Sequence, residues 1–265
     1  MNIIDKLNKR MDKANSLLSV GLDPDFDKLP EKFKRKENPQ FEFNKYIMDE
    51  THEYAAVFKP NNAFYEERGD QGLRELKMTI DYAREKYPDV FIIVDCKRGD
   101  IGNTNKGYLK ATYDWLGADA LTVSPYMGKE SLQPILNRKD KVCVILVRTS
   151  NPGAGEFQDL VFDGKPLWQI VAENVVNDWN ENENCMMVMG VTYPEEMKKG
   201  RQIAGDMTFL SPGFGPQGGS IDEWIKYGLN SEKKGLIINS SRAIIFSDNP
   251  KEEAKKLRDE INKYR

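Results

Sequence analysis

The sequence contains one histidine, His52, and three cysteines, Cys96, Cys143 and Cys185, among its 265 residues. A single histidine can supply neither a histidine-rich metal site nor a catalytic triad that needs a second base. The cysteines lie far apart and form no C-x-x-C pair, which argues against a disulfide framework and against a zinc site. We therefore expect free, buried thiols and a reducing, cytoplasmic location.

Long apolar runs and an excess of positive charge are also missing. No run approaches the length of a membrane span, and residues 1–13 alternate charged with apolar residues, unlike a signal peptide. The 39 basic and 42 acidic residues give a net charge of −3, so we expect no broad basic surface for nucleic acid and no membrane partner. A local cationic pocket for a phosphorylated small molecule is compatible with this balance.

The residues that are present suit a folded globular chain, with 39% hydrophobic and 31% charged residues. Eight short runs resemble β-strands, at residues 17–25, 55–64, 89–100, 118–128, 141–153, 185–194, 207–219 and 235–246. Most begin with consecutive apolar residues, as strands buried on both faces do, and most end in Gly, Pro, Asp, Asn or Ser.

Amphipathic helical patterns separate these runs, at residues 3–14, 74–87, 166–180 and 249–264. The first is expected to close the floor of a barrel. The charged stretch 26–45 is interpreted as a solvated loop or short helix, and His52 as a packing or surface residue on the helix before the second strand. Four tryptophans in helical segments are interpreted as packing residues: Trp115, Trp168, Trp179 and Trp224.

Alternating strands and helices are compatible with a closed barrel or with an open, doubly wound sheet. Polar residues gather at the C-terminal end of nearly every predicted strand, as an active site built from all the loops of a barrel requires. We therefore predict an α/β protein, a (β/α)8 TIM barrel whose single domain spans residues 1–265.

The segment FIIVDCKRGDIGNT combines a buried strand with charged residues. Asp95 and Lys97 lie two residues apart, so a regular strand would place them on one face and Cys96 on the other. Asp100 follows on the loop, and Lys59 ends the preceding strand. Adjacent parallel strands would then bring Lys59 beside the Asp95–Lys97 pair.

Two lysines that alternate with two aspartates suit a decarboxylation without a cofactor. Such a reaction leaves a carbanion, which needs a nearby cation and a proton donor, and a lysine can be both. An aspartate beside the departing carboxylate would repel it, and flanking lysines would keep both aspartates ionised. The alternative is an ion-pair network that only tethers loops.

The run DCKRGDIGNT resembles the signature of the orotidine 5'-phosphate decarboxylase family, in the form found in its longer microbial group. The resemblance spans the chain, because further motifs match in order. It implies a homodimer without metal or cofactor that converts orotidine 5'-phosphate to UMP and carbon dioxide, the last step of UMP biosynthesis.

The resemblance also assigns roles to the charged residues. It makes Lys97 the proton donor to C6 of the pyrimidine and places Asp95 beside the scissile carboxylate. Lys59 contacts the ribose and holds the charge network. Asp100 and Thr104 are residues that such enzymes lend to the partner subunit's site.

Other matched residues would bind the rest of the substrate. Asp23, in GLDPD, matches a ribose-binding aspartate, and Asn61, in KPN, is expected to reach substrate. Ser150, in RTSNPG, would hydrogen-bond the pyrimidine, with the segment as far as Glu156 forming a flap over the base. Asp-Pro and Ser-Asn-Pro-Gly are also common turn sequences, which is the alternative for both segments.

The seventh and eighth predicted strands are followed by GFGPQGG and NSSRAI. These two loops are the usual phosphate site of such barrels, and by resemblance Gln217 and Arg242 bind the phosphate. Plain glycine turns and a surface arginine are the alternative.

Two other functions stay open at this point. A metal-dependent relative, a sugar-phosphate decarboxylase or hexulose-phosphate synthase, shares the D-x-K-x-x-D strand, but such enzymes use a glutamate where this sequence has Lys59. A catalytically silent phosphate-binding barrel is the second alternative, because fold does not imply function.

Overall fold

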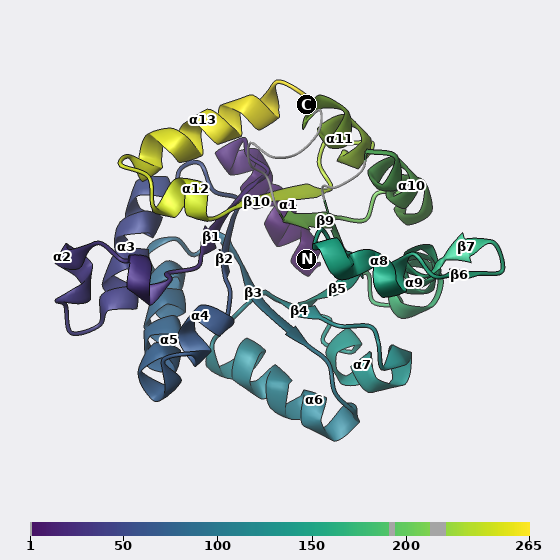
Figure 1. Cartoon of the computed structure of the whole chain (residues 1–265), viewed down its shortest axis with the longest axis horizontal. Coiled ribbons are helices and arrows are strands. Elements are labelled where there is room, and N and C mark those ends of the chain that lie inside the picture. The colour runs from purple at the N-terminus through teal and green to yellow at the C-terminus, as the bar shows by residue number, and fades with distance from the viewer. Residues whose placement is uncertain (1, 191–193, 213–220) are drawn as a thin grey trace.

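The computed structural model describes residues 2–190, 194–212 and 221–265. Its centre is a closed barrel of parallel strands in the order β1-β2-β3-β4-β5-β8-β9-β10, surrounded by helices (Figure 1). The strands are β1 (Leu18–Leu22), β2 (Val57–Pro60), β3 (Phe91–Arg98), β4 (Ala120–Val123), β5 (Val142–Arg148), β8 (Cys185–Met189), β9 (Phe209–Pro212) and β10 (Leu236–Ser240). Each lies inside one of the eight predicted runs.

The barrel closes because β1 pairs with both its chain neighbour and the last strand. Leu18 is in register with Ile238 of β10, and Ser19 with Val57 of β2. An open, doubly wound sheet would leave its edge strands unpaired, so that alternative is wrong and the predicted (β/α)8 barrel is confirmed.

Helices follow most strands and cover the outside of the barrel. The longer ones are α1 (Ile3–Ala14), α3 (Pro39–Thr51), α5 (Gly69–Lys86), α6 (Gly102–Leu109), α7 (Gly128–Leu136), α9 (Leu167–Asn174), α10 (Pro194–Ala204), α11 (Ile221–Gly228) and α13 (Pro250–Asn262). Two π-helical turns, Lys110–Trp115 and Val175–Trp179, extend α6 and α9. In the part of the chain that the structure describes, no helix is both long enough and apolar enough to cross a membrane.

Shorter elements lie mainly in the loops. They are the 3-10 turns Phe26–Lys28 and Pro152–Ala154, and the helices α2 (Glu31–Lys34), α4 (Ala63–Glu66), α8 (Gly155–Gln158) and α12 (Arg242–Ile245). A small hairpin, β6 (Val161–Phe162) and β7 (Lys165–Pro166), projects from the side of the barrel in Figure 1. Strands of two residues carry too little alternation to be predicted from the sequence, and these two were not predicted.

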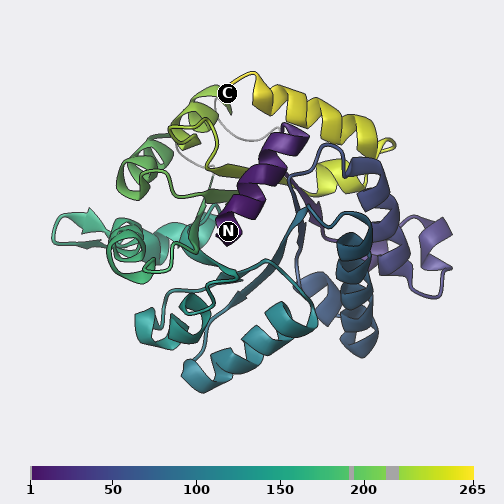
Figure 2. The same ribbon diagram turned by 180° about the vertical axis from the view of Figure 1, so that it is seen from behind.

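The first helix closes one end of the barrel, as predicted. Figure 2 shows α1 lying across the barrel, and its Leu7 and Met11 are fully buried. Its start is fixed by a capping box, in which Asn2 accepts from the Ile4 N–H while Asp5 accepts from the Asn2 N–H. A site built into this barrel therefore opens at the opposite end, where the strands terminate.

Two packing predictions need correction. Trp115 is 50% exposed at the end of its π-helical turn, whereas the other three tryptophans are buried. Cys143 and Cys185 are buried free thiols, but Cys96 is only half-buried. His52 directly follows α3, and its ring stacks on Tyr87 with 4.3 Å between the ring centroids.

Candidate active site

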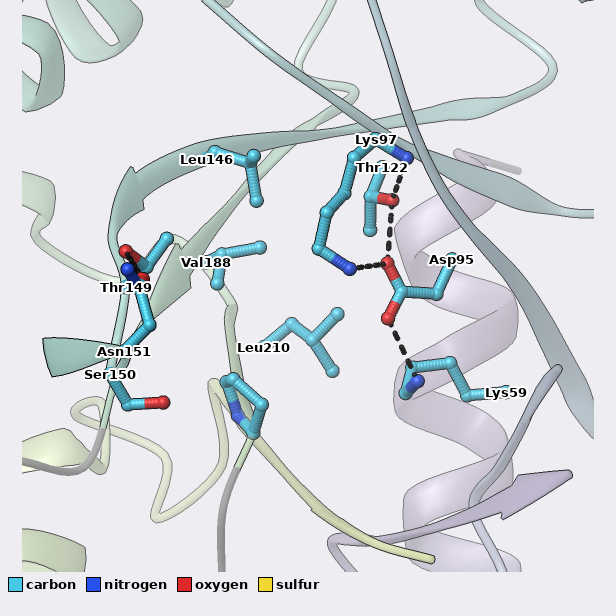
Figure 3. A pocket seen from close by; sticks show the side chains of 11 residues that line it. Lys59, Asp95, Lys97, Thr122, Leu146, Thr149, Ser150, Asn151, Val188 and Leu210 are labelled. Carbon is cyan, nitrogen blue, oxygen red and sulfur yellow. Dashed lines mark hydrogen bonds and ion pairs between the residues drawn. The ribbon is translucent and has the colours of Figure 1, made fainter. Parts of the chain in front are cut away.

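A cavity of about 420 Å³ lies at the C-terminal ends of the barrel strands. Lys59, Asp95 and Lys97 form its charged wall (Figure 3). Four apolar side chains also line it: Leu146, Val188, Leu210 and Pro212. The cavity can therefore hold a molecule with one charged and one apolar environment side by side.

The charged wall is one carboxylate held between two ammonium groups. Lys59 Nζ lies 3.0 Å from Asp95 Oδ2, and Lys97 Nζ lies 2.7 Å from Oδ1. Burial by itself would raise the pKa of Asp95, but the charges of Lys59 and Lys97 hold that pKa well below its ordinary value. Asp95 is therefore an anion at neutral pH.

Lys59 is buried, and its charge depends on its neighbours. Burial alone would lower the pKa of Lys59, yet the carboxylates of Asp95 and Asp23 raise it above the ordinary value. Asp23 follows β1, and one of its oxygens accepts from the Asn61 N–H at 3.1 Å. Three strand ends are thus joined around one buried cation.

Lys97 reaches Asp95 through a bulge rather than through the regular alternation of a strand. Its φ is +46°, in the left-handed region, and the pairing of β3 with β4 shifts between Val94 and Arg98. Asp95 and Lys97 do face the same cavity, which Cys96 does not line, but the regular strand backbone assumed for this segment is wrong. The bulge leaves the Lys97 side chain 51% exposed at the mouth of the cavity.

Ser150 lines the cavity on the side opposite the lysines, together with Thr149 and Asn151 (Figure 3). Gln158 stabilises the loop of Ser150, because the Thr149 N–H donates to Gln158 Oε1 at 2.9 Å. The predicted flap is thus built from a 3-10 turn and α8, whose last residue, Gln158, returns to Thr149.

Gly190, directly after β8, was not predicted from the sequence to take part in the site. A Cβ there would lie 2.9 Å from the backbone nitrogen of Ser150, so only glycine lets the end of β8 approach this loop. Thr122, which lines the cavity from β4, was also not predicted as a site residue. A polar residue within an apolar run was the one available signal for it.

Asn61 stands beside the charged wall but its side chain is already engaged. Its backbone bridges to Asp95, and its side-chain oxygen accepts from the Ala63 N–H at 3.1 Å. That hydrogen bond fixes the turn into α4. The side-chain N–H groups of Asn61 take no part in it, so they are the part of this side chain that can reach a substrate.

The structure does not bring Asp100 and Thr104 to the cavity of their own chain. Asp100 Oδ1 accepts from the neighbouring Ile101 N–H at 2.7 Å, and Thr104 is exposed on α6. Neither is found among the described residues that line the cavity.

Of the two residues predicted to bind the phosphate, the structure describes only Arg242. Arg242 begins α12, two residues after β10, and is exposed at the same end of the barrel as the cavity. Gln217 lies outside the described residues. Within the ranges 2–190, 194–212 and 221–265, no group of three or more His, Cys, Asp or Glu side chains is arranged to hold a metal ion.

The closed barrel and its lysine–aspartate–lysine wall define a barrel enzyme whose chemistry depends on fixed charges at the strand ends. The chain belongs to the orotidine 5'-phosphate decarboxylase / HUMPS family, whose model matches residues 16–257. The family predicted from the sequence is thereby confirmed.

Curated relatives and a solved structure agree with this assignment. An orotidine 5'-phosphate decarboxylase of Flavobacterium johnsoniae is 45% identical over 258 residues, covering 97% of this chain and 94% of the relative. One from Christiangramia forsetii is 46% identical over 242 residues, covering 91% and 88%. The structure of Leishmania donovani OMP decarboxylase superposes with a TM-score of 0.89 at 36% identity, covering 100% of this chain and 99% of that one.

Proposed function

We propose that this chain decarboxylates orotidine 5'-phosphate to UMP and carbon dioxide, the last step of UMP biosynthesis. The observation that carries the proposal is the Lys59–Asp95–Lys97 array at the cavity wall. The similarity of the whole chain to named decarboxylases supports it.

In the proposed reaction the substrate carboxylate lies next to Asp95, and the repulsion between the two anions favours its departure. The bond between C6 and the carboxylate breaks, and its electron pair stays on C6. The Lys97 ammonium stabilises this carbanion and then gives it a proton, which forms UMP. The neutral Lys97 regains its proton from solvent through the exposed mouth.

The apolar wall completes this arrangement. Leu146, Val188 and Leu210 offer no hydrogen bond to a carboxylate, but they accommodate uncharged carbon dioxide. Lys59 keeps Asp95 ionised during the step, because its ammonium stays 3.0 Å from the second carboxylate oxygen.

The remaining residues bind the substrate in this proposal. Asp23 and Asn61, joined at 3.1 Å beside Lys59, hold the ribose hydroxyls. Ser150, across the cavity, hydrogen-bonds the pyrimidine. Arg242 clamps the phosphate after the last barrel strand, with Gln217 from the preceding loop.

The direct test follows the fall in ultraviolet absorbance as orotidine 5'-phosphate loses its carboxylate. We expect turnover to continue unchanged in excess EDTA, because the Lys59 ammonium stands where a metal-dependent relative needs a carboxylate ligand. Activity that is lost with EDTA and restored by Mg²⁺ would favour that relative instead. Absence of turnover under every condition would favour the silent barrel.

We further infer that the chain works as a homodimer in which Asp100 and Thr104 complete the partner's cavity. Asp100 follows β3 and Thr104 lies in the first turn of α6, yet neither is among the described residues that line the cavity of their own chain. Ile101, next to Asp100, is 59% exposed, and Tyr126, in the loop after β4, is 85% exposed. Large apolar side chains that are exposed favour burial against a second copy, and a two-fold interface would place each loop at the other site.

Mixing two inactive variants tests the shared site. Lys97→Ala and Asp100→Ala, refolded together, should recover activity in about a quarter of all sites, since half the dimers are mixed and one of their two sites is intact. A mixture of Lys97→Ala with Asp95→Ala is the control and should stay inactive, because these two groups meet within one chain. If the first mixture is as inactive as the second despite subunit exchange, the shared site is wrong.

Two further expectations remain proposals. We propose that residues 1–265 act as one domain, because the first barrel strand pairs with the last. A single cooperative unfolding transition would be the expected result in a thermal or denaturant melt.

We also propose a cytoplasmic location, which the three free cysteines support. Fractionation of cells, followed by detection with an antibody to the chain, tests this location.

A further inference from the structure

The hydroxyl of Thr122 occupies a central position in the charged wall. Thr122 lies on β4 and is fully buried. Its Oγ1 accepts the backbone N–H groups of Cys96 at 3.0 Å and Lys97 at 2.9 Å. The same oxygen lies 2.9 Å from Asp95 Oδ1 and donates to it (Figure 3).

These contacts leave the hydroxyl only one orientation. A threonine hydroxyl has two lone pairs and one proton. Both lone pairs face N–H donors from the bulge, so the proton can point only at the Asp95 carboxylate. The hydroxyl is therefore a fixed dipole aimed at the anion, oriented before any substrate arrives.

The same hydroxyl supports the bulge that presents Lys97. Four steps along β3, from Val94 to Arg98, face only two along β4, from Leu121 to Val123. Within this bulge Lys97 has a φ of +46°, which is costly for a residue with a side chain. Acceptance of two consecutive N–H groups by Thr122 stabilises that backbone and so sets the direction of the Lys97 side chain.

We propose that Thr122 is a positioning residue that holds Asp95 and Lys97 in their reactive geometry during decarboxylation. The inference rests on the proposed function and extends it. Before the reaction, Asp95 Oδ1 is held by both Lys97 Nζ at 2.7 Å and Thr122. When Lys97 gives its proton to C6, it loses its positive charge and its attraction for Asp95. The Thr122 hydroxyl then still donates its hydrogen bond to Asp95 Oδ1, which keeps the Asp95 carboxylate ionised and in place.

The test replaces Thr122 with valine, which keeps its shape, and with serine, which keeps its hydroxyl. Thr122→Val should lower kcat by about 100-fold, since displacement of reacting groups by about 1 Å has effects of this size. Thr122→Ser should stay within about fivefold of the unaltered protein, because it lacks only the methyl group that restricts χ1. Thr51→Val is the matched control, since the buried Thr51 hydroxyl donates only within α3, to the Ile47 carbonyl at 2.7 Å.

Binding of the product UMP separates positioning from general damage. UMP has no carboxylate and needs no proton to bind, so its dissociation constant should change by less than about threefold in Thr122→Val. Equal losses of kcat and UMP affinity would show a merely structural role and overturn the proposal. So would a valine variant with kcat within about threefold of the unaltered protein, or a serine variant no better than valine.

A crystal structure of Thr122→Val gives a readout that does not depend on activity. We expect Lys97 to leave the left-handed region and the Asp95 carboxylate to rotate, whereas Thr122→Ser should retain both. Failure of the unaltered protein to act on orotidine 5'-phosphate would contradict the proposed function alone. An unchanged Asp95 and Lys97 in the valine variant would contradict the role of Thr122 alone.

Discussion

Replacement of Lys97 by alanine should lower decarboxylation by more than 100-fold while the protein remains folded. A positioned proton donor is typically worth about 10²–10⁴-fold, and here the same group also stabilises the carbanion. The measurement is the steady-state rate with orotidine 5'-phosphate, alongside a thermal melt. The half-exposed side chain has little packing to lose, so the melt should change little.

Lys139→Ala is the matched control for this substitution. Lys139 is exposed in the turn after α7, outside the cavity, so its loss should leave the rate unchanged. If a folded Lys97→Ala variant keeps more than about a hundredth of the activity, the assignment of Lys97 as proton donor is wrong.

The second large effect is expected at Arg242, far from the bond that breaks. Arg242→Ala should lower kcat/KM by about 100-fold or more, because each charge-assisted hydrogen bond to an anion contributes about 1.5–3 kcal/mol. Binding energy at a non-reacting group can be used to organise the transition state, so kcat should fall as well as affinity. Gln217→Ala should have a smaller effect, since an amide carries no charge.

Orotidine without its phosphate gives the control for Arg242. The unaltered protein and Arg242→Ala should turn over this truncated substrate at the same low rate, because the arginine then has nothing to bind. A variant equally impaired with both substrates would show that Arg242 supports the fold of the loop rather than the phosphate. If Arg242→Ala has the kinetics of the unaltered protein with the full substrate, the assignment of Arg242 to the phosphate site is wrong.

The barrel could be predicted because its strands are short apolar runs that end in turn-forming residues. Closure was inferred only from the clustering of polar strand ends, since periodicity carries no information on which strands pair. The pairing of Leu18 with Ile238 depends on contacts between residues 220 positions apart, a separation that no local pattern encodes.

For the charged wall, the sequence predicted the residues but not the backbone that presents them. The composition of the segment around Asp95 and Lys97 pointed to the right residues, but the alternation rule gave the wrong local backbone. A hydroxyl on the next strand accepts two N–H groups of the bulge, and that contact is tertiary, so no local pattern encodes it. Gly190 escaped notice for a similar reason, because its role appears only when β8 lies against the loop of Ser150.

The position of α1 has a consequence for the traffic of molecules through the site. Because this helix covers the far end of the barrel, molecules reach the cavity from the end at which the strands terminate. Substrate enters and UMP leaves by that same end, so bound UMP blocks the binding of the next substrate. UMP should therefore act as a purely competitive inhibitor, and viscous solvents that slow its exit should slow turnover wherever departure limits the cycle.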